Sequence, residues 1–175
     1  MFDNVIASYK ILHKILTRRN LNTVAAIFFC LVTSSFTNTA LAADCELSPT
    51  ADIKPQTVIK TVIDALKSNS DNDDGIAQVF CFASPENKKM TGPIERFASM
   101  IKRGYGDMLN HIASEYEPIE IDGKVAQQRV WLETADGSVV GYLFRLGKQS
   151  SGEFSDMWMT DAVYRLDPSE RKQSI

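Results

Sequence analysis

The stretch FASPENKKMTGPIERFASMIKRGYGDML, residues 82–109, decides the fold of this chain. The dipeptides Ser84–Pro85 and Gly92–Pro93 each suit a helix start. Proline has no backbone N–H, and at the first helical position that N–H would have no partner within the helix. After the second proline, apolar residues recur at the spacing of one helical face: Ile94, Phe97, Ala98 and Ile101. The stretch therefore predicts a short helix and then an amphipathic helix over 93–103 that ends at Gly104.

Tyr105 follows this helix and lies between two glycines. Its hydroxyl could point into the interior of the fold, or its ring could plug the opening as part of the core; we favour the plug. We expect the 93–103 helix to lie across a curved antiparallel sheet formed by the residues after it. Any activity would then depend on the space between the helix and the sheet.

The chain has 175 residues and a formal charge of −3. This length is typical of one domain. The small negative charge argues against nucleic acid as a partner, since binding to nucleic acid normally needs a basic face.

The N-terminus carries the pattern of a secretory signal peptide over residues 1–42. Basic residues up to Arg19 precede a short apolar run, 24–32, and small residues at Ala40 and Ala42 suit cleavage after Ala42. The run is too short to span a bilayer, so we favour a cleaved signal over a membrane anchor. The sequence predicts an exported protein, periplasmic or extracellular, which meets the membrane only through this signal before cleavage.

The exported part contains two cysteines, Cys45 and Cys81. Two thiols in an oxidising compartment favour one disulfide, which would stabilise the fold by about 3–4 kcal/mol. The alternative is that Cys81, between Phe80 and Phe82, is a small buried apolar residue. Both interpretations remain open.

The exported part is predicted to form one α+β domain over 53–167, after a flexible tether at 43–52 and before a disordered tail at 168–175. A helix is expected from Pro55, because apolar residues form one broad face: Val58, Ile59, Val62, Ile63 and Leu66. A polar turn and a second, short helix follow. The acidic turn at 71–75 does not match a calcium loop, because Cys81 stands where the bidentate glutamate should be.

Strand patterns replace helix patterns after Leu109. A segment divided by Pro118 predicts an edge strand or a bend. Longer strands are expected over 124–134, 138–148 and 156–166, with Asp136-Gly137 as a two-residue hairpin turn.

That turn sets a register in which Trp131 faces Tyr142, and Arg129 faces Phe144, on one face of the sheet. With Tyr105, these four residues are the candidate binding residues. They could bind an aromatic or anionic ligand by stacking and cation–π contact. The alternative is that they pack against the helices or at a dimer face. The opposite face is also expected to be apolar.

Several short motifs resemble the family of domain of unknown function 4864: Phe82-Ala-Ser-Pro85, Gly92-Pro93-x-x-Arg96-Phe97-x-x-Met100, Tyr105 and Ala126-Gln-Gln-Arg-Val130. The order of helices and strands resembles the nuclear transport factor 2-like (cystatin-like) superfamily. This resemblance implies a cone of N-terminal helices packed on a curved antiparallel sheet of about four strands. In the last strand, only Trp158 matches the usual Gly-x-Trp-Arg-Ile-x-Gly of the family. The resemblance implies a fold and no reaction.

No catalytic residue, metal site or cofactor is predicted. His111 is the only histidine after the signal, and a single histidine does not make the usual histidine-rich metal site. Asp64 and Asp161 are weak candidates for an acid, and no serine lies in a nucleophile elbow.

Three hypotheses for function follow. The first is a non-enzymatic domain that binds a small apolar or aromatic ligand, or a protein partner, at the cone or on the exposed sheet face. The second is an isomerase- or hydrolase-like enzyme with Tyr105 and a carboxylate inside the cone. The third is a structural homodimer without a pocket.

Overall fold

The computed structural model describes residues 45–171. The described residues all belong to one compact unit of the chain. The predicted signal peptide lies outside the described residues, as do the first residues of the tether and the last residues of the tail.

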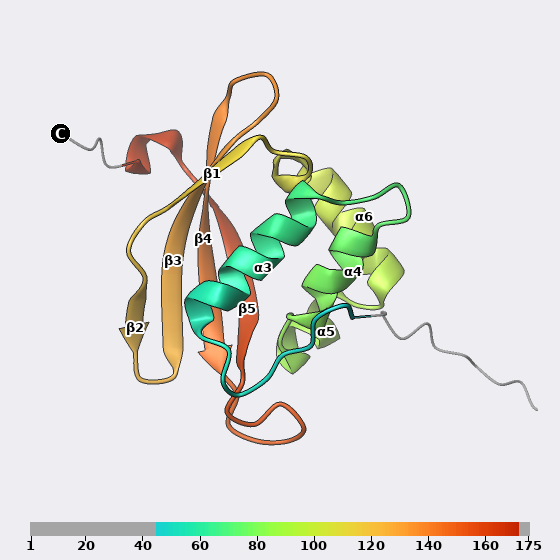
Figure 1. Cartoon of the computed structure of the whole chain (residues 1–175), viewed down its shortest axis with the longest axis vertical. Coiled ribbons are helices and arrows are strands. Elements are labelled where there is room, and N and C mark those ends of the chain that lie inside the picture. The colour runs from blue at the N-terminus through green and yellow to red at the C-terminus, as the bar shows by residue number, and fades with distance from the viewer. Residues whose placement is uncertain (1–44, 172–175) are drawn as a thin grey trace, which may run out of the picture. The chain divides into compact units, whose positions relative to one another are not determined.

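The described residues form an α+β fold with four α-helices and an open antiparallel sheet of five strands, which confirms the predicted class. The helices are α3 (Pro55–Lys67), α4 (Asp74–Cys81), α5 (Pro85–Thr91) and α6 (Ile94–Gly104), and a 3-10 turn η1 (Gly106–Met108) follows them. The strands are β1 (Ala113–Tyr116), β2 (Glu120–Asp122), β3 (Val125–Glu133), β4 (Val139–Lys148) and β5 (Trp158–Leu166), and a second 3-10 turn η2 (Pro168–Glu170) ends the fold. In Figure 1, α3 crosses in front of the sheet, and α4, α5 and α6 lie beside it.

Both predicted helices of the 82–109 stretch are present, although the C-cap of α6 is Tyr105 rather than the predicted Gly104. Ser84 caps α5, since its hydroxyl accepts a hydrogen bond from the amide of Asn87 at 3.3 Å. Helix α6 begins directly after Pro93 and buries Phe97 and Ile101 in the core. The amphipathic helix α6 therefore packs in the core shared with the sheet, as the sequence predicted.

The sheet has the strand order β1-β3-β4-β5, and β2 also pairs with β3 beyond the end of β1. The interruption between β1 and β2 contains Pro118, which agrees with the predicted break. One face of the sheet packs against the helices and supplies these core residues: Ala126, Val130, Leu132, Tyr142, Phe144 and Leu146.

The hairpin between β3 and β4 differs from the prediction. The amide of Thr134 donates to the carbonyl of Ser138 at 2.9 Å, so the loop has three residues, with Gly137 at φ +80°. A three-residue loop with a left-handed glycine is the next most common hairpin after the two-residue turn. The register moves by one residue, which puts Tyr142 opposite Val130 rather than opposite Trp131.

A shift of one residue changes which side chains of the two strands share a face of the sheet. The four predicted binding residues of the sheet are therefore divided between its two faces. Tyr142 and Phe144 face the helices and are fully buried. Arg129 and Trp131 lie on the outer face, where Trp131 packs flat against Gly141. A side-chain carbon on Gly141 would lie 2.3 Å from the indole ring, so this close contact requires glycine.

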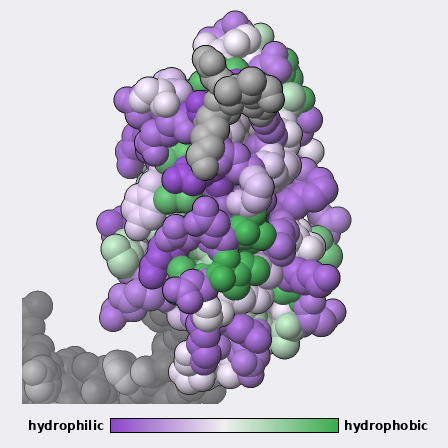
Figure 2. All heavy atoms as spheres, turned by 90° about the vertical axis from the view of Figure 1, so that its left-hand side faces the viewer, coloured by the Kyte–Doolittle hydropathy of each residue, from purple (hydrophilic) through white to green (hydrophobic). Residues whose placement is uncertain are grey.

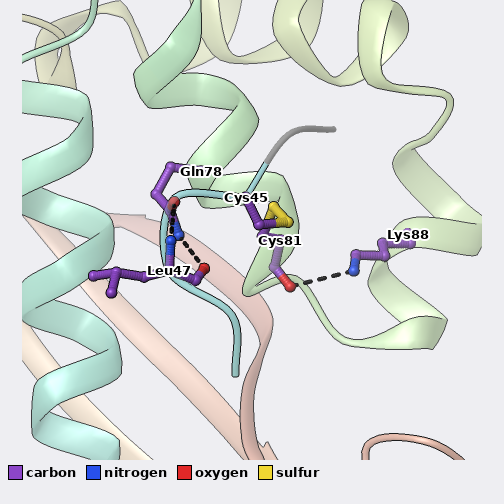
Figure 3. Close-up of a disulfide and its surroundings, with 5 residues drawn as sticks. All are labelled: Cys45, Leu47, Gln78, Cys81 and Lys88. Atoms are coloured by element: carbon purple, nitrogen blue, oxygen red, sulfur yellow. Dashed lines mark hydrogen bonds between the residues drawn. A yellow bond between two sulfur atoms is a disulfide. The ribbon is translucent and has the colours of Figure 1, made fainter. Parts of the chain in front are cut away.

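The N-terminal segment from residue 45 is attached to α4 (Figure 3). Cys45 and Cys81 form a disulfide. The side chain of Gln78 makes two hydrogen bonds with the main chain of Leu47, at 2.7 and 2.9 Å. Lys88 of α5 donates to the carbonyl of Cys81 at 3.2 Å. Residues 45–52 are therefore held at two points, in contrast to the flexible tether that the sequence predicted.

The start of the predicted disordered tail is also ordered. Asp167 and Glu170 form a capping box around η2, because each side chain accepts a hydrogen bond from main-chain amides at the start of the turn. Arg171 then bonds to Glu115 of β1 at 2.7 Å. Residues 168–171 therefore fold back against the sheet.

Candidate functional site

A cavity of about 190 Å³ lies between the helices and the sheet, in the space that the sequence analysis identified as decisive. Its walls come from all four helices, η1, β4, β5 and the turn between α4 and α5. Most of its lining is apolar, and the aromatic and sulfur-containing members are Phe97, Phe144, Tyr105, Met90, Met100 and Met108. The core is therefore not packed solid.

The cavity reaches solvent beside α5 and α6. Met90 of α5 lines it and is 66% exposed, while Met100 of α6 is half-buried. Unbranched thioether side chains adapt to guests of different shape. A mouth formed by two methionines can thus change its width without moving the backbone.

Strand β5 forms the polar part of the wall. At Thr160 the main chain is fully used, because its amide donates to Phe82 at 2.8 Å and its carbonyl accepts from Ser84 and Asn87. The Thr160 hydroxyl is buried and has no hydrogen-bond partner. The wall therefore contains one unused hydrogen-bonding group on the side of the sheet that faces the helices.

A bulge follows Thr160 and moves a carboxylate away from the cavity. The register of β4 and β5 shifts between Arg145 and Leu146, which leaves Asp161 as the extra residue. The Asp161 carboxylate occupies the space over Gly147 on the outer face and lies 3.8 Å from Arg145. The only acidic residue in the cavity wall thus directs its charge to the other side of the sheet.

Tyr105 lines the cavity directly after the end of α6. Its hydroxyl donates to the carbonyl of Val163 at 3.1 Å, and its ring centroid lies 6.0 Å from that of Tyr142. The hydroxyl bonds to main chain on the open edge of β5, and so the side chain also covers part of that edge.

Tyr142 lies behind Tyr105 as a neutral phenol. Burial raises its pKa to about 12, and its hydroxyl has no hydrogen-bond partner. The guanidinium of Arg165 lies 5.9 Å from the ring centroid and is paired with Asp107. Because this ion pair is already formed, neither charge is left for a guest in the cavity.

The other two candidate binding residues lie away from the cavity. The indole N–H of Trp131 donates to Glu117 at 2.8 Å, and Arg171 covers the ring at 5.9 Å. Arg129 is half-buried on the same outer face. The structure therefore brings Tyr105, Tyr142 and Phe144 together and leaves Arg129 and Trp131 apart from them.

The sequence analysis did not identify Met90, Met100 or Thr160 as site residues. The available signal was one pair of methionines, Met90 and Met100. They lie on either side of Gly92–Pro93, the turn between α5 and α6. Nothing local marks Thr160, because its neighbours across the cavity lie more than fifty residues earlier in the chain.

The outer face of the sheet is a weaker candidate. Figure 2 shows a hydrophobic patch and smaller, separate hydrophobic areas on a largely hydrophilic side of the molecule. The exposed apolar residues Ile121 and Tyr164 lie in β2 and β5, on opposite sides of β3 and β4. They therefore do not form one continuous apolar surface.

The candidate acids and the histidine are not arranged for catalysis in the described residues. Asp64 is exposed and paired with Lys60 at 2.7 Å. No aspartate or glutamate is buried among residues 45–171, and no cluster of three or more metal-ligating side chains is present there. The enzyme hypothesis needed a carboxylate inside the cavity, and this part of the chain does not supply one.

His111 is a buried structural residue. Its Nδ1 lies 2.9 Å from the carbonyl of Met108, which can only accept, so Nδ1 carries the proton. The Nε2 atom is buried without a partner. Burial lowers the pKa of this imidazole below its usual 6.5, with Lys67 acting in the same direction; the bond to Met108 and the charge of Asp64 oppose the shift.

Acidification from pH 7.5 to 5.5 should therefore lower the free energy of unfolding. The unfolded chain takes up a proton at His111 near pH 6.5, while the folded chain resists it, so the stability is present above that pH and is lost below it. His111→Asn keeps a donor for Met108 and removes the titration. Urea unfolding across this range should give a flatter pH profile for the variant, and equal slopes would contradict the assignment.

The fold and the cavity define a small α+β domain with a mainly apolar site that is open to solvent on one side. Residues 49–173 match the family described as Domain of unknown function (DUF4864), and the chain belongs to that family. The comparisons with curated proteins and with solved structures found no match. Among the described residues, no helix is both long and apolar enough to cross a membrane.

Proposed function

We propose that this protein is an exported, non-enzymatic domain that binds a small apolar molecule in the cavity between α5, α6 and β5. The observation that carries the proposal is the unfilled, mainly apolar space of about 190 Å³ with an adaptable methionine mouth. Empty apolar space in a core costs stability, because the lining atoms lose their contacts. A domain that keeps such a space open to one side is suited to take up a guest.

We further propose the nuclear transport factor 2-like superfamily as the wider relationship. Helices that pack on one face of an antiparallel sheet, with a cavity between the two layers, support it. The β-bulge after Thr160 adds to this support, since bulges bend strands and give a sheet curvature.

Export is supported by the disulfide, because disulfides persist in oxidising compartments. The basic and apolar pattern of residues 1–42 supports a signal peptide that would direct this export. We expect the protein recovered from the periplasm of an expressing bacterium to start at Ala43. Intact mass measurement distinguishes this product from an uncleaved chain, which would contradict the proposed signal.

Binding can be tested with toluene as the probe and with a matched pair of variants on α6. Met100→Trp places a large ring at the mouth of the cavity. It should weaken toluene binding about ten-fold, because the guest would lose apolar contact area similar to that of one buried side chain. Ser99→Trp adds the same ring at the neighbouring exposed position and should leave the affinity unchanged. Titrations followed by NMR report both affinities.

Two results would contradict the proposal. One is that the wild-type protein does not bind toluene at millimolar concentration. The other is that both tryptophan variants weaken toluene binding equally, since the guest would then not enter beside Met100.

A further inference from the structure

The polar groups of the cavity wall indicate which class of molecule it takes. This inference rests on the proposed function and narrows it. We infer that the guest is a neutral molecule with a single aromatic ring and one hydroxyl or carbonyl group, and that this polar group bonds to the hydroxyl of Thr160.

Size sets the first limit. An engineered apolar cavity of about 150 Å³ in another protein holds benzene, whereas sites for drug-sized ligands begin at about 300 Å³. The present cavity, at about 190 Å³, lies just above the first value. It fits one ring with a small substituent and is too small to enclose a sterol or a long acyl chain.

The lining favours an aromatic ring over a saturated one. Phe97, Tyr105 and Phe144 contribute three aromatic side chains, and Met90 and Met100 contribute two thioethers at the mouth. Aromatic rings gain from offset or edge contacts with other rings, and sulfur–aromatic contacts are favourable as well. A saturated ring of the same size gains neither.

Charge sets the third limit. The Asp161 carboxylate lies on the far face of the sheet with Arg145, and Arg165 is paired with Asp107. Lys88 of α5 is held by the carbonyl of Cys81 and lies 5.2 Å from the centroid of the Phe154 ring. A charged guest would thus be buried without a counter-ion, which is strongly unfavourable, so carboxylates and amines are excluded.

The Thr160 hydroxyl indicates which polar group the guest carries. The residue Thr160 is 95% buried and lines the cavity, and its hydroxyl has no partner within the protein, although the main chain of this residue is fully bonded. A buried hydroxyl without a partner is costly, and a guest that supplies one hydrogen bond removes that cost. Asn87 and Thr91 already bond to each other and to main chain, so Thr160 is the free group on this wall.

The experiment compares phenol with toluene, which have the same shape and differ in one polar group. We expect phenol to bind the wild-type protein, and the ratio of phenol to toluene affinity to fall about five-fold in Thr160→Val, the effect of one neutral hydrogen bond. This variant should fold, because it removes a hydroxyl that makes no bond. Benzoate, benzylamine and methylcyclohexane should each bind more weakly than phenol.

The outcomes separate this inference from the proposed function. If toluene binds but the affinity ratio is the same in Thr160→Val, the role of Thr160 is wrong and the apolar site stands. If benzoate, benzylamine or methylcyclohexane binds as tightly as phenol, the neutral aromatic class is wrong. If none of the probes binds, the proposed function itself fails.

Discussion

Replacing both cysteines of the disulfide with alanine is expected to lower the free energy of unfolding by about 4 kcal/mol. Cys45 and Cys81 are 36 positions apart, and closing a loop of that length removes about this much chain entropy from the unfolded state. The native contacts around the bridge should persist, because Gln78 still binds the main chain of Leu47 by two hydrogen bonds. The fold should therefore remain and only its stability should fall.

Urea denaturation measures this effect, and three samples make it decisive. Wild-type protein reduced with dithiothreitol should match the double-alanine variant, since both lack the cross-link. Gln78→Ala keeps the cross-link and removes the two bonds to Leu47, and should cost only about 2 kcal/mol. A loss below about 1 kcal/mol for the double variant would show that the bridge does not constrain the unfolded chain.

The amphipathic helix α6 could be predicted because its determinants are local. Pro93 directly before the helix and the spacing of Phe97 and Ile101 act within a few residues, as does the Ser84 cap of the preceding helix α5. Such signals stay visible in a sequence whatever the rest of the chain does.

The hairpin register could not be read from the same kind of signal. Asp-Gly is typical of a two-residue turn, but Asp136 here bonds to the hydroxyl of Thr134 and to the amide of Ser138. Those bonds favour the three-residue loop, in which only Gly137 needs a positive φ. One residue in a loop thus decided which aromatic side chains meet the helices.

The cavity depends on packing across elements and has no local signal. Thr160 and Met90 belong to different parts of the chain, and the volume between them is set by every side chain around it. The sequence identified the place to look, between the 93–103 helix and the sheet. It could not say whether that space is filled, because close-packed and open cores can share one apolar pattern.

The substitution Gly75→Ala is expected to destabilise the protein by about 3 kcal/mol, although alanine is the better helix former. Gly75 lies in the first turn of α4, where this helix touches α3. A side-chain carbon there would lie 2.1 Å from the carbonyl oxygen of Ala65 and 3.0 Å from the Cα of Asn69. Both are backbone atoms, so a side-chain rotation cannot relieve the clash and the helices must separate.

Gly104→Ala is the matched control, because it makes the same chemical change at the last residue of α6. No atom lies within 4 Å of a side-chain carbon at Gly104, so this variant should keep or gain about 0.5 kcal/mol. Urea unfolding of the two variants compares them directly, and equal stabilities would show that α3 and α4 do not approach closely at Gly75.

Separation of the helices should also reach the cavity. Val79 of α4 and Val62 of α3 both line it, so moving α4 away from α3 changes the volume between them. Gly75→Ala should therefore weaken toluene binding as well as stability, while Gly104→Ala should change neither by much. If Gly75→Ala lowered stability and left toluene affinity intact, the cavity would not depend on how α3 and α4 pack.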